Sequence, residues 1–210
     1  MTIDKIICVG KNYLDHALEL GDRVPEKPVI FLKPASVLNQ ALHWGEQLTA
    51  IFPEGESSVQ PECELVLSIG KDGFRMNAEE AAQSITAVSF GLDMTLRTHQ
   101  SELKKQGHPW TTAKVFPDAA ILGPWISCDE FQHFMDCNFQ LTLDERVTQC
   151  AKGQDMMMHP VDLLVYISGF FSLKAGDIVF TGTPGGVSSI SRTSTAKLEW
   201  DTYTYSVKWL

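Results

Sequence analysis

The sequence lacks an excess of positive charge and a long apolar segment. It has 17 Lys and Arg residues against 26 Asp and Glu residues, which gives a formal net charge of -9. Nucleic acids and anionic membranes favour a basic face, so we expect neither as a partner. No apolar run reaches the roughly 18 residues of a membrane-spanning helix, and the run after Met1 is too short for a signal-peptide core. We therefore expect a cytoplasmic protein.

Paired-cysteine motifs are also absent. The five cysteines are odd in number and have no C-x-x-C spacing: Cys8, Cys63, Cys128, Cys137 and Cys150. This pattern disfavours a thiolate zinc site and a redox motif. Isolated cysteines in apolar surroundings are usually small buried hydrophobic residues. The histidines other than His16 form no metal-ligand spacing. We expect a reducing compartment.

No internal repeat, low-complexity tract or linker interrupts the 210 residues, so we expect one domain over residues 1–210. Strands are predicted near residues 5–10, 29–33, 63–70, 85–95, 139–143 and 177–181, with a pair at the C-terminus. The chain shows no regular βαβ alternation, which disfavours a Rossmann or TIM-barrel fold. The pattern predicts an α+β, β-rich fold with a mixed sheet or barrel and a few helices.

Helices are predicted in four places. One or two turns precede Gly21, and Asn77 with Glu80 has the pattern of a capping box. A third helix covers about residues 96–106 and ends at Gly107. A broad apolar helix is predicted within residues 159–175. Residues 40–60 are polar and rich in breakers, so we expect them to be irregular.

Two glutamates stand at the start of an apolar strand, in "ECELVLSIG". Side chains on a strand alternate, so Glu62 and Glu64 should leave the same face. Like charges side by side repel each other, and their burial is costly. A hard dication such as Mg²⁺, Mn²⁺ or Ca²⁺ would compensate them, and Asp93, at the end of another apolar run, is a candidate third ligand. By itself the E-x-E pattern is a weak signal, and without other evidence it fits two solvated glutamates at the start of a strand better.

Other chemistry-bearing residues each have two interpretations. His16 and Glu19 have i, i+3 spacing, which fits a general-base dyad or a common surface pair. Lys114 follows Pro109 and Trp110 as either a solvated strand residue or a fixed cation for a substrate carboxylate. The segment "FTGTPGGV", with the Thr181 and Thr183 hydroxyls and its backbone N–H groups, fits a carboxylate-binding loop or only a tight turn.

Taken in order, these segments resemble the fumarylacetoacetate hydrolase superfamily, most closely its short, single-domain bacterial and mitochondrial branch. The resemblance runs from about residue 6 to residue 186. It is carried by the segments "VGKNYLDHALE", "PVIFLKP", "ECELVLSIGK", "GLDMTLRTHQ", "PWTTAKVF", "DMMMHPVDLLVYIS" and "LKAGDIVFTGTPGGV". It implies a mixed β-sheet roll, a homodimer, and one Mg²⁺ or Mn²⁺ per subunit on Glu62, Glu64 and Asp93.

The resemblance also implies roles around the substrate. His16 and Glu19 become the dyad, on a lid that orders over the substrate. Lys114 lies beside the substrate, Thr183 binds a substrate carboxylate, and Gln100 is a polar residue near the pocket.

The sequence departs from the family pattern at three points. Lys11 stands where Arg is frequent, and Gln60-Pro61 stands where His-His often precedes the first glutamate. Pro117 replaces a frequent Asp, with Asp118 one residue later. No expected ligand is lost, but the identity of the substrate stays open.

The implied chemistry acts on small 2-oxo acids through an enolate that the metal stabilises. Three reactions share this intermediate: keto–enol tautomerisation, decarboxylation of oxaloacetate, and hydrolysis of acylpyruvates such as fumarylpyruvate or acetylpyruvate. We expect oxaloacetate tautomerisation, because the chain is most similar to the short branch and lacks the large N-terminal domain of the fumarylacetoacetate-cleaving members. A different class also stays open, a metal-binding interaction protein without catalysis, against which the complete set of expected site residues argues.

Overall fold

The computed structural model describes residues 3–19, 27–56 and 58–210. These residues form thirteen strands, five α-helices and two short 3₁₀ helices. The strands are β1 Lys5–Gly10, β2 Val29–Pro34, β3 Leu38–Gln40, β4 Gln47–Ala50, β5 Val59–Ile69, β6 Ile85–Leu96, β7 Ala120–Leu122, β8 Ile126–Ser127, β9 Asn138–Leu143, β10 Arg146–Lys152, β11 Ile178–Phe180, β12 Thr195–Trp200 and β13 Tyr203–Trp209. The helices are α1 Leu14–Glu19, η1 Ala35–Val37, α2 Ala78–Ser84, α3 Arg97–Gln106, α4 Thr111–Lys114, η2 Gly153–Asp155 and α5 Pro160–Ser168.

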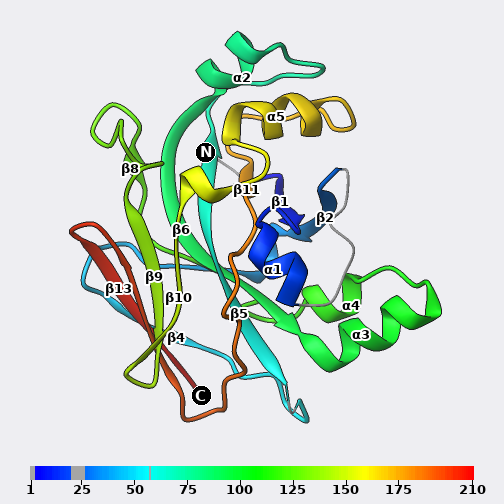
Figure 1. The fold of residues 1–210 in the computed structure, drawn as a ribbon, viewed down its shortest axis with the longest axis vertical. Coiled ribbons are helices and arrows are strands. Elements are labelled where there is room, and N and C mark those ends of the chain that lie inside the picture. Colours follow the sequence, from blue (N-terminus) through cyan, green and yellow to red (C-terminus); the bar gives the residue numbers. More distant parts are fainter. Residues whose placement is uncertain (1–2, 20–26, 57) are drawn as a thin grey trace.

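The larger sheet is mixed and has the order β2-β1-β11-β5-β6-β7-β3, with β8 paired to β6. Its centre is the long antiparallel pair of β5 and β6, which curves through the middle of the molecule in Figure 1. The β1–β11 and β3–β7 pairs are parallel. The smaller sheet has the order β10-β9-β12-β13-β4. This arrangement confirms the predicted β-rich α+β fold.

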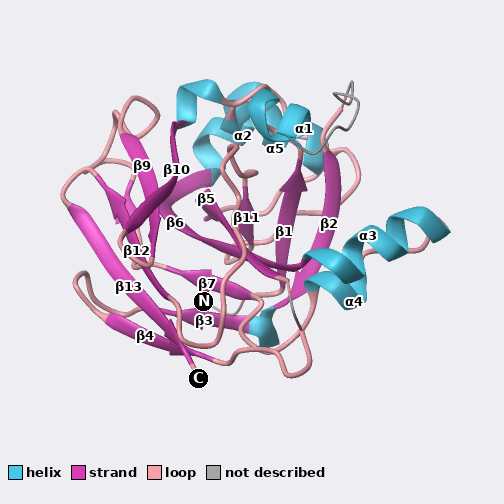
Figure 2. Ribbon diagram, turned by 60° about the horizontal axis from the view of Figure 1, so that its bottom comes forward, coloured by secondary structure: helices cyan, strands magenta, loops and turns pink. Residues whose placement is uncertain are grey.

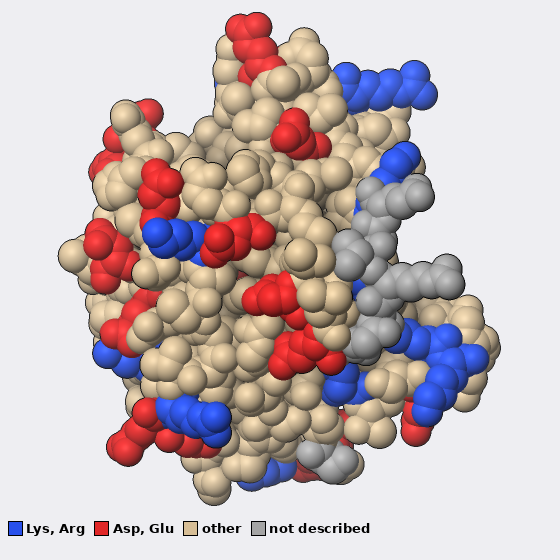
Figure 3. Space-filling model, in the orientation of Figure 1, with Lys and Arg blue, Asp and Glu red and all other residues tan. Residues whose placement is uncertain are grey.

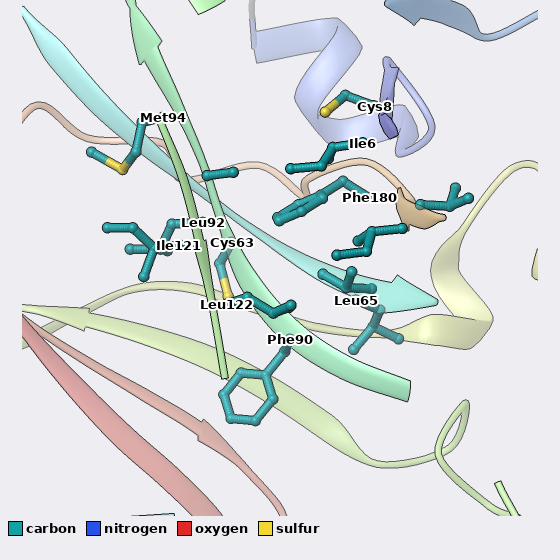
Figure 4. Packing of buried hydrophobic residues seen from close by; sticks show 14 of the residues in the cluster. Ile6, Cys8, Cys63, Leu65, Phe90, Leu92, Met94, Ile121, Leu122 and Phe180 are labelled. Carbon is teal, nitrogen blue, oxygen red and sulfur yellow. The ribbon is translucent and has the colours of Figure 1, made fainter. Parts of the chain in front are cut away.

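Aromatic side chains join the two sheets. Phe90 reaches from β6 toward the strands of the smaller sheet, away from Ile6 and Phe180 (Figure 4). Its ring stacks on Trp44 with centroids 5.7 Å apart and meets the edge of Trp200 at 5.6 Å. Because aromatic rings bury large apolar areas, this contact gives the two sheets one continuous core.

The alternation of β5 and β6 separates the core from the site. One face of the pair carries apolar residues such as Cys63, Leu65 and Phe90, which belong to the core. The opposite face carries Glu62, Glu64 and Asp93. Since successive side chains leave opposite faces of a strand, the same two strands build both the core and the site.

The helices lie around the larger sheet. Figure 2 shows α1, α2 and α5 at one end of the molecule, and α3 with α4 to one side. The helix α2 begins with the predicted capping box, in which Asn77 Oδ1 accepts from the Glu80 N–H and Glu80 Oε2 from the Asn77 N–H. Among the described helices, none has the length and apolar character needed to cross a membrane.

Two predictions about secondary structure are wrong. Within residues 40–60, Gln47–Ala50 forms β4, which pairs in parallel with β13. The predicted helix over residues 159–175 ends at Ser168, because the chain then turns at Gly169 and Leu173 exchanges two backbone hydrogen bonds with Gly73. Gly21 and part of the expected lid lie outside the described residues. The single domain over residues 1–210 stays a prediction.

Candidate active site

Three carboxylates converge on one face of the larger sheet. Glu62 and Glu64 lie on β5, and Asp93 on β6 is the direct cross-strand partner of Glu62. Glu64 faces Gly91, which has no side chain. All three acidic residues are buried, and one ligand oxygen from each lies within 4.8 Å of the others. No other His, Cys, Asp and Glu group with this geometry occurs in the described part of the chain.

A lysine bridges two of these carboxylates. Lys114, on the short helix α4, places its Nζ 2.8 Å from Glu62 Oε2 and 2.7 Å from Asp93 Oδ2. Arg97, at the start of α3, contacts the other oxygen of Glu62. Lys114 is therefore a buried cation on a helix, and its interpretation as a solvated strand residue is wrong.

A second buried lysine, Lys33 on β2, contacts the other carboxylate oxygen of Asp93. Its Nζ is 2.5 Å from Asp93 Oδ1 but donates its hydrogen bonds to the carbonyls of Met94 and Ala119, at 3.1 and 2.5 Å. Asp93 Oδ1 accepts no hydrogen bond, although it is buried. This oxygen is thus charge-compensated by a close ammonium, although the contact does not have the geometry of a hydrogen bond.

The two glutamates have opposite electrostatic environments. Burial by itself would raise the pKa of the Glu62 carboxyl, but Lys114 and Arg97 hold that pKa well below its usual value. Burial, together with the Asp93 and Glu62 carboxylates, raises the pKa of Glu64 well above its usual value. Burial opposes the charge of Lys114, yet its two carboxylate partners raise its pKa.

Glu64 has no cationic side chain beside it within the described residues. Its Oε2 accepts one hydrogen bond, from the Gly182 N–H at 2.7 Å. A buried carboxylate without a cation is unfavourable unless something compensates it. Three buried carboxylates, one of them unpaired and one with an oxygen that accepts no hydrogen bond, fit a hard dication with oxygen ligands.

His16 and Glu19 lie on α1, which follows β1. The His16 ring is buried and lines the cleft, and its Nδ1 lies 3.7 Å from Glu19 Oε2. No hydrogen-bond partner reaches Nδ1 among the described residues. Burial lowers the pKa of His16, so the imidazole is neutral at neutral pH. His16 and Glu19 are therefore close to each other in the structure but do not form a hydrogen bond.

The turn after β11 binds carboxylates of the chain itself. The Gly182 N–H donates to Glu64, the Gly185 N–H to Asp15 Oδ2 at 3.1 Å, and the Gly186 N–H to Glu19 Oε2 at 3.0 Å. Gly182 has φ +106°, a left-handed conformation that favours glycine. These bonds hold α1 against the turn.

The threonine hydroxyls of this segment donate to carbonyls of β5. Thr181 Oγ1 donates to Leu65 O at 2.9 Å, and Thr183 Oγ1 donates to Cys63 O at 2.8 Å. Thr183 nevertheless lines the cleft. Its hydroxyl is thus engaged with the strand that carries the glutamates.

The cleft above the carboxylates is narrow, with a cavity volume of about 30 Å³. Cationic side chains line much of it: Lys11, Arg97, Lys104 and Lys114. Figure 3 shows Lys and Arg side chains gathered over α3, on the same side of the molecule. Phe31 and Trp110 supply an apolar wall. Gln100 is buried in this lining, and its Oε1 accepts from Arg97 Nη1 at 2.6 Å.

The structure brings every residue of the predicted site into or beside this cleft. The sequence analysis missed two cations of this site, Lys33 and Arg97. A lysine inside the apolar run "VIFLKP" is an unusual signal that could have indicated Lys33. Arg97 directly follows the strand that carries Asp93.

Comparisons with known proteins found relatives in sequence and in structure. Residues 5–204 match the family described as "Fumarylacetoacetate (FAA) hydrolase C-terminal". The chain is 36% identical over 187 residues to "Oxaloacetate tautomerase fahd-1, mitochondrial" of Caenorhabditis elegans, covering 89% of this chain and 85% of that protein. It is 38% identical over 186 residues to "Oxaloacetate tautomerase YcgM" of Escherichia coli (strain K12), covering 88% and 83%. Among solved structures, fumarylpyruvate hydrolase from Pseudomonas aeruginosa with Mn²⁺ and pyruvate is similar, with TM-score 0.94, 32% identity and coverage of 99% and 90%.

Proposed function

The chain belongs to the fumarylacetoacetate hydrolase family, in its short oxaloacetate tautomerase-like branch, and on this premise we propose that it catalyses keto–enol tautomerisation of oxaloacetate with a divalent metal. The observation that carries the proposal is the buried triad of Glu62, Glu64 and Asp93, in which Glu64 has no cation partner among the described residues. Relatives named as oxaloacetate tautomerases support the choice of substrate.

Mg²⁺ or Mn²⁺ would be held by Glu62, Glu64 and Asp93. When bound, it supplies a Lewis acid for negative charge on the 2-oxo oxygen of the substrate. The carboxylates come from two paired strands with a fixed register, so their relative positions are set by the sheet. Such preorganised charge needs little rearrangement during the reaction.

The charge balance of the site favours a dianionic substrate. The three carboxylates face three cations, Lys33, Lys114 and Arg97. Among these six groups alone, a dication leaves an excess of two positive charges, which a dicarboxylate neutralises. Oxaloacetate carries this charge at neutral pH.

His16 is the proposed base at C3. It is buried, lines the cleft, and its lowered pKa leaves the imidazole able to accept a proton. Glu19, whose Oε2 lies 3.7 Å from Nδ1, would orient the ring once this contact shortens in the substrate complex. Lys114 is the less suitable base, because its carboxylate partners raise its pKa and keep it protonated. Its role is that of a fixed cation beside the substrate.

Two further residues complete the proposed substrate contacts. Gln100 uses its Oε1 to accept from Arg97, which leaves its amide N–H groups for a substrate oxygen. Thr183 directs its hydroxyl proton to Cys63 O, so its proposed contact with a substrate carboxylate is made by the backbone N–H.

Acylpyruvate hydrolysis is the second candidate, favoured by the similarity to a fumarylpyruvate hydrolase. Oxaloacetate decarboxylation uses the same groups without an attacking water. The complete set of acidic, basic and cationic residues argues against a non-catalytic interaction protein. The homodimer and the cytoplasmic location stay predictions; light scattering on the purified protein tests the dimer.

Stopped-flow absorbance at the enol band of oxaloacetate, with a pyruvate assay on the same sample and Mg²⁺ or Mn²⁺ present, tests the proposal. We expect kcat/KM for enol conversion at least about tenfold above that for decarboxylation or acetylpyruvate hydrolysis, a gap of roughly 1.4 kcal/mol. Pyruvate formation as fast as enol loss would show a decarboxylase instead.

A further inference from the structure

A buried glutamine from the smaller sheet reaches the strand that carries the glutamates. Gln149 lies on β10, next to an irregularity in the pairing of β10 with β9, and is 1% exposed. Its Oε1 accepts from the Cys63 N–H at 2.9 Å, and Cys63 is the residue between Glu62 and Glu64. A side chain of the smaller sheet therefore bonds to the backbone of β5 between the two candidate metal ligands.

At Cys63 the edge of β5 that faces away from β6 has no neighbouring strand among the described residues, and the bond from Gln149 takes the place of one. The pairing of β11 with β5 covers Val66–Ser68, and Thr181 still bonds to Leu65. At Cys63 the backbone N–H and C=O on that side bond instead to the side chains of Gln149 and Thr183. Because a buried backbone group needs a partner, these two side chains take the place of a missing ladder.

The bonds close a ring. The Cys63 N–H donates to Gln149 Oε1, Gln149 Nε2 donates to Thr183 Oγ1 at 2.8 Å, and Thr183 Oγ1 donates to Cys63 O. Nε2 also donates to Pro184 O at 2.8 Å. The partners fix the amide orientation, since Cys63 N–H needs an acceptor and the Pro184 carbonyl needs a donor.

The same turn then contacts the rest of the site. Its N–H groups bind Glu64 and the α1 carboxylates of Asp15 and Glu19. Gly186 has φ +92°, and a Cβ there would lie 2.0 Å from Thr148 O, so the turn sits directly on β10. Gln149 thus connects the β5 glutamates with the turn on which α1 and His16 rest.

We propose that Gln149 is a positioning residue that fixes β5 at Cys63 and the turn of residues 182–186 relative to each other. By fixing β5, Gln149 raises the affinity of the site for the dication. By fixing the turn, it raises the affinity for the substrate carboxylate and holds α1 in its position. The substrate part rests on the proposed function, whereas the metal and turn parts do not.

Three variants test this role. Gln149→Leu removes all its hydrogen bonds at similar volume. Gln149→Glu keeps an acceptor for the Cys63 N–H but loses the donors to Thr183 and Pro184. The matched control is Gln140→Leu, because Gln140 is a glutamine of the adjacent strand β9 whose side chain bonds to Glu199. Mn²⁺ binding and oxalate binding to the Mn²⁺-loaded protein are measured by calorimetry, and amide exchange by mass spectrometry.

For Gln149→Leu we expect Mn²⁺ affinity about tenfold weaker, as is typical for groups that orient metal ligands, and weaker oxalate binding. Exchange in residues 182–186 and in α1 should accelerate, with the Gln140→Leu values unchanged. For Gln149→Glu we expect retained Mn²⁺ affinity, with weaker oxalate binding and faster exchange of the turn. If Gln149 only stabilised the fold, its replacement would lower the melting temperature and leave the Mn²⁺ and oxalate affinities unchanged.

Wild-type affinities and exchange in both Gln149 variants would overturn the proposal. If Gln149→Leu does not fold, Gln149→Glu decides by the same measurements. If the wild type does not convert enol-oxaloacetate but Gln149→Leu still loses Mn²⁺ affinity, the proposed function fails and the positioning role stands.

Discussion

Glu62 and Glu64 leave the same face of β5 two residues apart, yet the pKa of Glu62 lies well below its usual value and that of Glu64 well above it. The difference comes from their partners. Lys114 and Arg97 contact Glu62, whereas Glu64 has only the Gly182 N–H within the described residues. The Glu62 carboxylate therefore stabilises the metal-free protein, whereas the Glu64 carboxylate destabilises it.

Replacing each glutamate by glutamine should shift the stability of the metal-free protein in opposite directions. Glu62→Gln removes one of the two carboxylate partners of the buried Lys114 and the carboxylate partner of Arg97, and it should cost about 3 kcal/mol. Glu64→Gln removes a carboxyl that, in the folded protein, must either carry a repelled charge or hold a proton, and it should stabilise by about 1 kcal/mol. Thermal unfolding at pH 8 in EDTA measures both, at roughly 2–4 °C per kcal/mol for a chain of this size.

The control is Glu199→Gln, which removes a surface ion pair with Lys197 and should change stability by less than about 1 kcal/mol. Shifts of the same sign for Glu62→Gln and Glu64→Gln would contradict the electrostatic interpretation of the site.

Mn²⁺ affinity should increase with pH. Because the pKa of Glu64 is raised in the folded protein, the carboxyl tends to hold a proton that it must release to bind a metal. In the metal-free protein the same shift favours the folded state below the unfolded pKa, a contribution lost as pH rises through the folded pKa. Calorimetry in buffers of different ionisation enthalpy should show proton release in the wild type and less in Glu64→Gln. Equal release in both would assign the proton to another group.

His16→Ala should lower kcat/KM for enol conversion by about 10²–10⁴-fold, the usual contribution of a general base. Burial lowers the pKa of His16, so the acid limb of the kcat/KM profile should lie below pH 6.5, the ordinary value. If His16→Ala abolishes acetylpyruvate cleavage but leaves enol conversion intact, His16 activates water and the C3 base is another group. Unchanged decarboxylation in the variant is compatible with either role.

Removing the α1 carboxylates should loosen this helix. Asp15→Ala and Glu19→Ala each delete one acceptor for the turn, Gly185 N–H or Gly186 N–H. Since one hydrogen bond is worth about 1 kcal/mol, amide exchange in residues 14–19 should accelerate about fivefold per variant. The exposed Leu18 provides the control, Leu18→Ala, in which exchange should stay near the wild-type rate. Identical exchange in all variants would show that other contacts hold α1.

Lys33→Met should destabilise the protein by about 3–5 kcal/mol, because it leaves Asp93 without its buried ammonium at Oδ1. The control Lys197→Met removes an exposed pair and should cost less than about 1 kcal/mol. Urea unfolding measures both. A small effect of Lys33→Met would mean that Lys114 alone compensates Asp93.

The sequence predicted the parts of the site that have a local signal. The two-residue spacing of Glu62 and Glu64 placed them on one face, and the apolar run before Asp93 placed it on a second strand, although β6 continues past it to Leu96. The register that pairs Glu62 with Asp93 has no local signature, because it depends on the length of the β5–β6 connection. Gln149 was not predictable either, since its partner Cys63 is 86 residues away and becomes adjacent only when the two sheets pack.

The fold shows the same division. The capping box of α2 was read from Asn77 and Glu80, which lie three residues apart. The strand β4 was missed because its partner β13 lies near the C-terminus. The sequence does not predict the end of α5 at Ser168, because it depends on the backbone hydrogen bonds of Leu173 with Gly73, a hundred residues earlier in the chain.

The three cations around the carboxylates would allow the protein to fold before a metal binds. Lys33, Lys114 and Arg97 balance the charge of the triad with groups that are part of the polypeptide itself. We therefore expect the chain to reach its native state before any ion binds. Metal binding would then be a separate, reversible step on a site that has already formed.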